Sequence, residues 1–99
     1  MNKYRLAFAA EHDLEEIEAY IAKDNPAAAE EVINNIESTC QLVADYPGVG
    51  SHRNEIERGV MSFPIGSYLI YYRVGEDDVV GIARIIHSSR DIGPAFHDQ

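Results

Sequence analysis

The residue types best suited to chemistry gather near the end of the chain, where His87, Ser88, Ser89, Arg90 and Asp91 follow one another. Histidine titrates near neutral pH, so His87 could act as a general base or acid if a neighbouring group oriented it. The two serines lack the glycine pattern of a strained nucleophile turn, which disfavours a serine triad. We therefore name His87 and Arg90 as the catalytic candidates. The competing interpretation, which the sequence favours, is a strand-end histidine hydrogen-bonded to backbone.

Metal and cofactor chemistry find little support in the remaining residues. His12 and His52 lie far apart in the sequence, and neither belongs to a ligand-spaced cluster with another histidine or with Cys40. The scattered glycines do not form a phosphate-binding loop. The carboxylates of HDLEE (12–16) and GEDD (75–78) are predicted to be solvated, on a helix surface and in a turn. The sequence therefore predicts no metal and no cofactor, and Cys40 is predicted to be a small core residue.

Apolar periodicity places two helices after a short first strand. The segment YRLAF (4–8) is aromatic and apolar enough for a strand, and AAEHDLEEIEAYIAK (9–23) has helical spacing. Asn25 is a good N-cap and Pro26 suits the first helical position, so a second helix should begin there and end at YPGVG (46–50). The short connection predicts an antiparallel hairpin, whose sheet-facing residues are Leu14, Ile17, Ile21, Ile33 and Ile36.

Three strand candidates follow the helices. VMSF (60–63) is a brief one that Pro64 should stop, and SHRNEIERG (51–59) before it has the composition of an exposed loop or a short extra turn. YLIYYRV (68–74) and VVGIARIIH (79–87) are stronger candidates on either side of the GEDD turn. This order predicts an α+β domain, β-α-α-β-β-β, with a helical hairpin packed on one face of a small antiparallel sheet.

The register of the last hairpin predicts which strand residues share a face. If the turn pairs Gly75 with Asp78, the helix-facing side carries no formal charge and includes Gly81 and Ala83. The other side is apolar with two embedded arginines, and an uncovered apolar face of this kind marks a partner site. The alternative is that residues 46–59 or the C-terminal tail fold over it, and a one-residue register error would separate the two arginines. The predicted partner face contains Leu69, Tyr71, Arg73, Val80, Ile82 and Arg84.

Length and composition bound the class of protein. The chain has 99 residues, enough for one small domain spanning 1–99, and its polar tail after about residue 91 is expected to fray. The net charge of −9 disfavours direct nucleic-acid binding, which needs cations to displace counterions from phosphates. No apolar run reaches the roughly 20 residues that span a membrane. The first residues lack a signal-peptide core, and the single cysteine fits a reducing environment, so the expected location is cytoplasmic.

The charges are unevenly distributed along the chain. Between Glu11 and Asp45 there are ten acidic residues and one basic residue, Lys23. From Tyr46 to Gln99 there are seven acidic and five basic residues, and all five basic residues are arginines. The first half is therefore an acidic block, which should steer an acidic partner towards the arginine-bearing strands.

Five segments, taken in order, resemble the ParE branch of the RelE/ParE toxin superfamily and cover nearly the whole chain. They are YRLAFAAEHDLEEIEAYIA, NPAAAEEVINNIE, YPGVGSHRNEI, SFPIGSYLIYYRV and IARIIHSSRDI. The specificity lies in the ordered set, which runs from a tyrosine-led first strand to a terminal His-x-x-Arg-Asp. The resemblance implies the same β-α-α-β-β-β order, with a partly curled sheet.

This resemblance implies the toxin of a type II toxin–antitoxin operon, carried by a plasmid or chromosome, with a role in plasmid stabilisation. A ParE-type toxin is implied to poison DNA gyrase and block replication, which makes it a binding protein rather than an enzyme. The implied partner is a ParD-like antitoxin, usually with a ribbon-helix-helix DNA-binding end, whose other end wraps the toxin in a hetero-oligomer. We expect Arg84 to anchor that antitoxin more strongly than Arg73, which lies nearer the exposed turn.

Departures from the nuclease branch of the superfamily help to choose between its activities. RelE-type relatives cut mRNA on the ribosome and typically have a basic residue early in the strand that corresponds to YLIYY, where this chain has Tyr68 and Leu69. Many relatives also have an aromatic residue where Ile92 stands. His87 and Arg90 leave a RelE-like ribosome-dependent mRNA endonuclease as the alternative. An inactive paralogue that only binds its antitoxin is the third reading.

Overall fold

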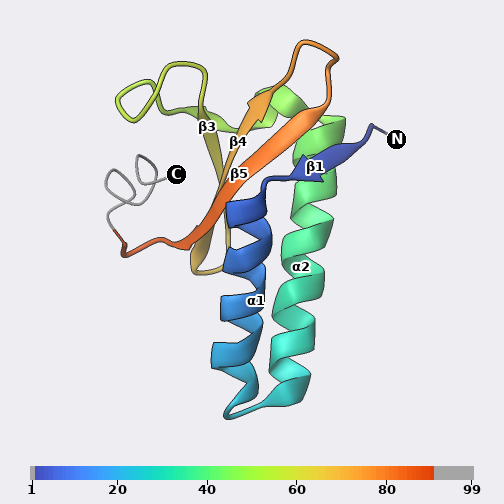
Figure 1. The fold of residues 1–99 in the computed structure, drawn as a ribbon, viewed down its shortest axis with the longest axis vertical. Helices are drawn as coiled ribbons and strands as arrows, with labels where there is room; N and C mark the ends of the chain where they lie inside the picture. The colour runs from blue at the N-terminus through green and yellow to red at the C-terminus, as the bar shows by residue number, and fades with distance from the viewer. Residues whose placement is uncertain (1, 91–99) are drawn as a thin grey trace.

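Two helices cover one face of a five-stranded sheet in the computed structural model, which describes residues 2–90 (Figure 1). This architecture confirms the predicted α+β class and helical hairpin. It adds a short strand, β2, in a segment predicted as loop, and the fraying expected after about residue 91 lies outside the described residues. The elements are β1 (Tyr4–Leu6), α1 (Phe8–Ala22), α2 (Pro26–Asp45), the 3-10 turn η1 (Pro47–Val49), β2 (Ser51–His52), β3 (Met61–Ile65), β4 (Tyr68–Val74) and β5 (Val80–His87).

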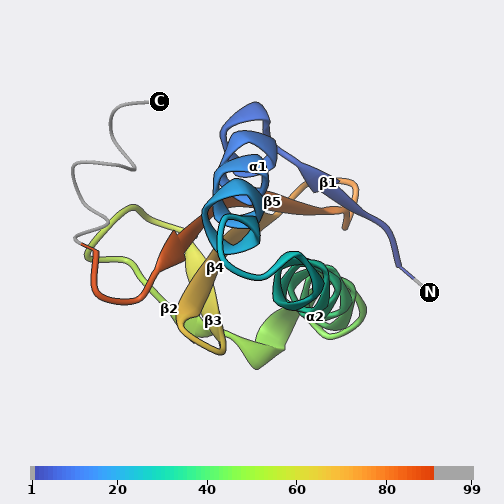
Figure 2. The same cartoon turned by 90° about the horizontal axis from the view of Figure 1, so that it is seen from below.

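The second helix begins and ends as its sequence predicts. The Asn25 side chain accepts a hydrogen bond from the Ala28 N–H (3.0 Å), and Pro26 occupies the first helical position. Pro47 follows the helix and opens η1, which turns the chain towards the sheet. α1 and α2 run antiparallel (Figure 1), and seen nearly end-on they lie side by side on one face of the sheet (Figure 2).

The first and last strands of the described chain are neighbours in the sheet, whose strand order is β1-β5-β4-β3-β2. β1 pairs in parallel with β5, whereas the other pairs are antiparallel, so the sheet is mixed rather than wholly antiparallel as predicted. A parallel pair needs a long crossover, and both helices lie within it. Arg5 of β1 consequently pairs with Gly81 of β5.

The main core lies between the helices and the sheet. Ile36 is 0% exposed, and Leu14 and Ile17 are partly buried against this core, which confirms the predicted inward faces of the helices. Ile21 and Ile33, predicted to face the same way, are half-buried. The most deeply buried members of the core are Ala10, Ile36, Cys40, Val43, Ala44, Ile70, Tyr72, Val80 and Ile82.

A smaller apolar cluster lies on the opposite, outer face of the sheet. Residues 53–60 form a loop across this face, and Ile56 and Val60 of the loop pack against strand residues, including Tyr71, which is 4% exposed. The alternative that a loop covers the second face is therefore confirmed for this part of the sheet. The cluster contains Val60, Tyr71, Ala83 and Ile86, with Ile56 and Leu69 packed against them.

The turn between β4 and β5 holds one residue more than predicted. The Gly75 N–H donates to the Val79 carbonyl (2.9 Å), so Gly75 faces Val79 rather than Asp78. Asp78 instead closes the loop in a left-handed conformation, with φ of 62°. Three-residue hairpin loops commonly end on a residue of this kind, and aspartate tolerates that conformation better than most residues. The extra residue shifts the pairing of β5.

This shift exchanges the two faces of β5 near the turn. Val80 and Ile82 are 0% exposed beneath the helices, so their prediction as partner-face residues is wrong. Gly81 and Ala83, predicted to face the helices, lie on the outer face instead. Because side chains alternate along a strand, a one-residue shift is enough to cause both errors.

A β-bulge further along β5 changes its faces once more. Tyr71 pairs with Arg84 whereas Tyr72 pairs with Ile82, which leaves Ala83 as the extra residue. The bulge breaks the alternation of side chains, so Arg84 reaches α1 although Tyr71, its partner across the strands, belongs to the outer cluster. The predicted register does not contain this bulge, and its single face with both Arg73 and Arg84 does not exist.

Candidate functional site

The helices and the strands carry opposite charges. α1 contains five acidic residues and α2 contains four, and neither helix contains lysine or arginine. The five strands contain no aspartate or glutamate, and their arginines are Arg5, Arg73 and Arg84. The helix layer therefore repels an acidic ligand, whereas each strand arginine forms an ion pair with a carboxylate of a helix, loop or turn. The next question is which of the three arginines such a ligand can reach.

Arg84 is held inside the protein by Asp13 of α1. Its Nε donates to Asp13 Oδ2 (2.8 Å) and its Nη2 to Oδ1 (2.9 Å), and the two side chains are 11% and 9% exposed. The Ile85 N–H also donates to Asp13 Oδ2 (2.9 Å), which fastens α1 to β5 just after the bulge. These hydrogen bonds to Asp13 raise the pKa of Arg84. The predicted solvation of the HDLEE carboxylates is wrong for Asp13, which lies on the buried stripe with Ala10 and Ile17.

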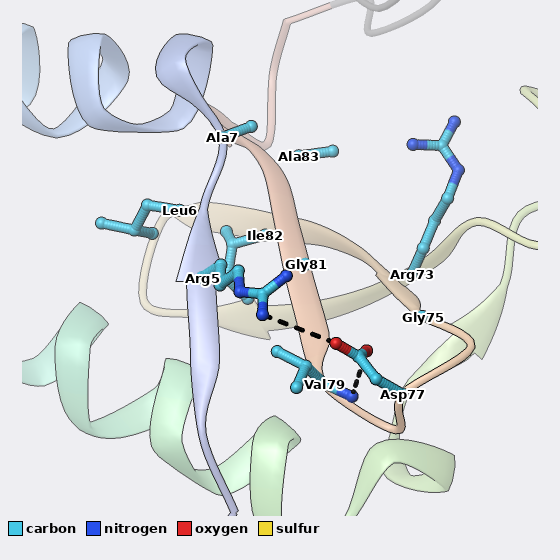
Figure 3. Close-up of a pocket in the computed structure, with 10 residues that line it drawn as sticks. All are labelled: Arg5, Leu6, Ala7, Arg73, Gly75, Asp77, Val79, Gly81, Ile82 and Ala83. Carbon is cyan, nitrogen blue, oxygen red and sulfur yellow. Dashed lines mark hydrogen bonds and ion pairs between the residues drawn. The ribbon is translucent and has the colours of Figure 1, made fainter.

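Arg5 and Arg73 lie on the outer face, one on each side of Gly81 (Figure 3). Gly81 pairs with Arg5 of β1 and with Arg73 of β4, so three neighbouring strands present a row that we call the Arg-Gly-Arg row. Arg5 forms an ion pair with Asp77 (3.5 Å), and Arg73 forms one with Glu57 of the covering loop. The arginine side chains are 76% and 42% exposed, so both guanidinium groups reach solvent.

An open groove of about 410 Å³ lies over this row. Its floor is low because Ala7, Gly81 and Ala83 contribute little or no side chain (Figure 3). A Cβ atom added to Gly81 would meet only the Arg73 carbonyl oxygen, at 4.0 Å. The groove therefore combines two exposed cations with open space at the backbone of the middle strand.

His87 lies in a second cleft, of about 450 Å³, which α1 and the end of β5 help to form. Its ring packs edge-on against Tyr68, with ring centroids 5.5 Å apart. Its Nδ1 accepts a hydrogen bond from the Ser89 N–H (3.1 Å) and lies 2.8 Å from Ser89 Oγ. This backbone contact is the one that the strand-end interpretation predicts. Arg90 lines the same cleft, so the two catalytic candidates share one opening, and residues 91–92 lie outside the described residues.

The six residues predicted to bind an antitoxin do not form one surface. Val80 and Ile82 belong to the main core, and Arg84 belongs to the contact with α1. The other three residues lie on the outer face. Leu69 and Tyr71 pack beneath the loop, and the Arg73 side chain is 42% exposed at the groove. Their role in antitoxin binding stays a prediction.

Sequence reasoning missed four residues that shape these sites. Asp13 could have been found, because it shares the helical stripe of buried apolar residues. Arg5 and Gly81 could not have been paired, because their contact depends on a parallel pairing between distant strands. Glu57 lies in an irregular loop, where no periodic signal locates a side chain.

Cys40 is a buried free thiol in the main core. Burial in the main core, with a smaller contribution from Glu37, raises the pKa of the Cys40 thiol to about 12, which suits a core residue rather than a nucleophile. Within residues 2–90 no His, Cys, Asp and Glu side chains gather into a group that could hold a metal ion. None of the helices in this range has the length and apolar character needed to cross a bilayer.

Comparison with known proteins identifies the family. The family model for the ParE toxin of the type II toxin–antitoxin system parDE matches residues 4–92. Toxin ParE1 of Caulobacter vibrioides is 30% identical over 90 residues, which cover 90% of this chain and 92% of that protein. Toxin RelE3 of the same species is 33% identical over 89 residues, which cover 89% and 96%. The chain therefore belongs to the ParE toxin family of type II toxin–antitoxin systems, within the RelE/ParE superfamily.

Solved structures share the fold. A chain of the chromosomal ParDE toxin–antitoxin system from P. aeruginosa superimposes with a TM-score of 0.73 at 20% identity, over 88% of this chain and 96% of that chain. A chain of the RelBE2 toxin–antitoxin complex from Mycobacterium tuberculosis gives a TM-score of 0.56 at 26% identity, over 87% and 96%. The helical hairpin on a mixed sheet is thus the fold of both the ParE-type and the RelE-type neighbours.

Proposed function

We propose that this chain is the toxin of a ParDE-type pair, that it inhibits DNA gyrase, and that a cognate antitoxin neutralises it. The observation that carries the proposal is the ParE family match over residues 4–92. Proteins named Toxin ParE1 in Caulobacter vibrioides and Mycobacterium tuberculosis, at 30% and 26% identity, support it. The antitoxin is proposed to be ParD-like, with a ribbon-helix-helix end for DNA and a second segment that binds this chain in a hetero-oligomer.

The charge distribution supports a protein target rather than RNA. The two helices carry nine acidic residues without a lysine or arginine, and a protein that grips RNA relies on several cations that displace counterions. Of the strand arginines, Arg84 already holds Asp13 in a buried contact. Inhibition by contact with gyrase needs no such cationic surface.

A RelE-like mRNA endonuclease is the second candidate function. It is favoured by the common cleft of His87 and Arg90 and by the 33% identity to Toxin RelE3. In such an enzyme His87 would accept a proton from the attacking hydroxyl group, and Arg90 would hold the phosphate. The acidic helix α1 borders this cleft with Glu16, whose exposed carboxylate opposes the approach of a polyanion.

Controlled expression in a bacterium that lacks the antitoxin separates these functions. Gyrase inhibition predicts filamentation with a DNA-damage response, unchanged in a His87→Ala variant and relieved by co-expression of the antitoxin. Prompt loss of protein synthesis with cut messages, abolished by His87→Ala, would replace the proposal with the nuclease. Normal growth at a verified level of folded protein would identify an inactive paralogue that only binds its antitoxin.

A further inference from the structure

The second helix carries another largely apolar stripe besides the one that it buries in the main core. The buried stripe contains Ala29, Ile36, Cys40 and Val43. The other stripe follows the spacing i, i+3, i+7, i+10 and i+14, which keeps side chains on one side of a helix. We call it the α2 seam, and its residues are Val32, Asn35, Thr39, Leu42 and Tyr46.

Other elements of the protein flank only the N-terminal half of the α2 seam. Val32 and Asn35 line a cleft of about 240 Å³ between α2 and the turn from β3 to β4. Thr39 is buried, and its hydroxyl group donates to the Asn35 carbonyl (2.8 Å), so its hydrogen-bonding capacity is already used. Leu42 and Tyr46 are 39% and 65% exposed, so no element of residues 2–90 covers the C-terminal half of the seam.

The exposed end of the α2 seam is anchored to the sheet by Tyr72. This residue is 0% exposed, and its hydroxyl group donates to the Pro47 carbonyl (2.7 Å) and accepts from the Gly50 N–H (3.0 Å). These hydrogen bonds fasten the 3-10 turn that directly follows Tyr46. Because the backbone of this end is already fixed on both sides, a partner would bind it at a small cost in ordering.

We propose that the α2 seam binds an amphipathic helix of DNA gyrase, whose apolar side chains pack on Leu42 and Tyr46 and whose flanking side chains are cationic. The inference rests on the proposed function for the identity of this partner. It assigns the gyrase contact to the helix layer, and the arginines of the outer face keep their present ion pairs.

The spacing of the α2 seam favours a helix as its occupant. Steps of three and four residues recur where helices pack along one another, because each side chain then enters a gap between residues of the facing helix. The seam runs from Val32 to Tyr46, which is roughly 21 Å along a helix axis at the α-helical rise per residue. Tyr46 supplies an exposed aromatic side chain of the kind that anchors protein–protein contacts.

Unpaired carboxylates favour cationic flanks on the bound helix. Glu31 precedes Val32 and borders the α2 seam, and Glu30 and Glu37 are exposed on the same helix. Within residues 2–90 none of these glutamates forms an ion pair, whereas every strand arginine does. The glutamates of α2 are therefore charges that a partner's lysines or arginines can still neutralise, and they repel an acidic helix.

Supercoiling assays with purified gyrase and purified variants of the chain test the α2 seam. Leu42→Ser and Tyr46→Ser truncate its exposed end, and each should raise the half-inhibitory concentration of the chain by about tenfold or more. Phe8→Ser removes an apolar side chain that is 88% exposed on α1, outside the seam, and should leave inhibition unchanged. None of these residues belongs to either apolar cluster, so the melting temperatures should stay close to that of the unaltered chain. Inhibition by both seam variants at the same concentration as the unaltered chain would overturn the proposal.

A charge reversal tests the cationic flank of the gyrase helix. Glu31→Lys places a cation beside the α2 seam and should weaken inhibition, whereas Glu18→Lys makes the same change at an exposed position of α1 and should weaken it less. Equal weakening by the two variants would show that net charge is responsible, and it would overturn the assignment of cations to that flank.

Two further measurements separate the other possible occupants of the α2 seam. A second copy of the chain would make Leu42→Ser turn a dimer into a monomer in sedimentation, whereas the proposal expects the same sedimentation with and without this change. The antitoxin as occupant would make the seam variants lose antitoxin affinity in calorimetry while they inhibit gyrase fully. Either result would overturn the proposal. Failure of the proposed function is a different outcome, because the unaltered chain itself would then leave gyrase fully active.

Discussion

The two faces of the sheet are covered in different ways, and one arginine on each side shows the consequence. Beneath the helices, Arg84 and Asp13 are 11% and 9% exposed and form two hydrogen bonds with each other. On the outer face, Arg73 and Glu57 are 42% and 48% exposed. Arginine therefore makes a buried structural contact at position 84 and a solvent-accessible ion pair at position 73. Burial, rather than residue type, decides which arginine a partner can use.

The largest expected effect is on the helix-covered side. Arg84→Ala leaves the Asp13 carboxylate buried with the Ile85 N–H as its remaining donor, and breaking a buried pair in this way costs about 3–5 kcal/mol. Urea denaturation should show this loss in the free energy of unfolding. A loss below about 1 kcal/mol would mean that the contact does not hold α1 to β5.

The next largest expected loss of stability comes from the apolar main core rather than from the Arg84–Asp13 ion pair. Ile36 is 0% exposed in the main core, so Ile36→Ala should lower the free energy of unfolding by about 2–4 kcal/mol. Ile33→Ala, at a half-buried position of the same helix, is the matched control and should cost less. Thermal and urea unfolding measure both variants. Equal losses of free energy in the two variants would contradict the deeper burial of Ile36.

The burial of Cys40 in the main core should also make the free energy of unfolding depend on pH in the alkaline range. Burial raises the pKa of Cys40 from 9.0 to about 12, so the folded state binds a proton that the unfolded state releases between these values. Stability is therefore fully present below pH 9 and is lost as pH rises towards about 12, by on the order of 1 kcal/mol near pH 10. Cys40→Ala should flatten this part of the urea-derived stability profile. An unchanged slope would contradict the account of Cys40.

The smallest effect belongs to the outer face. Glu57→Gln removes the charge that pairs with Arg73, and exposed pairs of this kind contribute between about 0 and 1 kcal/mol. The free energy of unfolding should change within that range, and Glu16→Gln on the exposed face of α1 should behave alike. A loss comparable to that of Arg84→Ala would remove the distinction between the two faces.

Much of the fold could be predicted because its signals are local. Helical spacing, the Asn25 cap and Pro26 locate the hairpin, and the apolar segments on either side of the turn locate β4 and β5. The register depends on smaller differences in energy. A left-handed Asp78 lengthens the turn by one residue, and a bulge at Ala83 shifts the pairing again. Neither feature leaves a periodic trace in the sequence.

The candidate site was predicted less well than the fold for a physical reason. The sequence predicts Arg73 on the outer face, but the groups around it there come from β5, from β1 beyond that strand and from an irregular loop. Arg5 meets Gly81 only because the first and last strands pair in parallel. Such non-local contacts depend on the whole topology, so the spacing of residues in one segment cannot reveal them.

The proposed function is that this ParE-family chain inhibits DNA gyrase and that an antitoxin neutralises it. The most direct measurement is the supercoiling activity of purified gyrase with increasing amounts of the purified chain. Direct inhibition of gyrase predicts a loss of supercoiling that His87→Ala retains and that an equimolar amount of antitoxin reverses. Full gyrase activity at all concentrations, together with cleavage of mRNA when the chain is added to translating ribosomes, would contradict it.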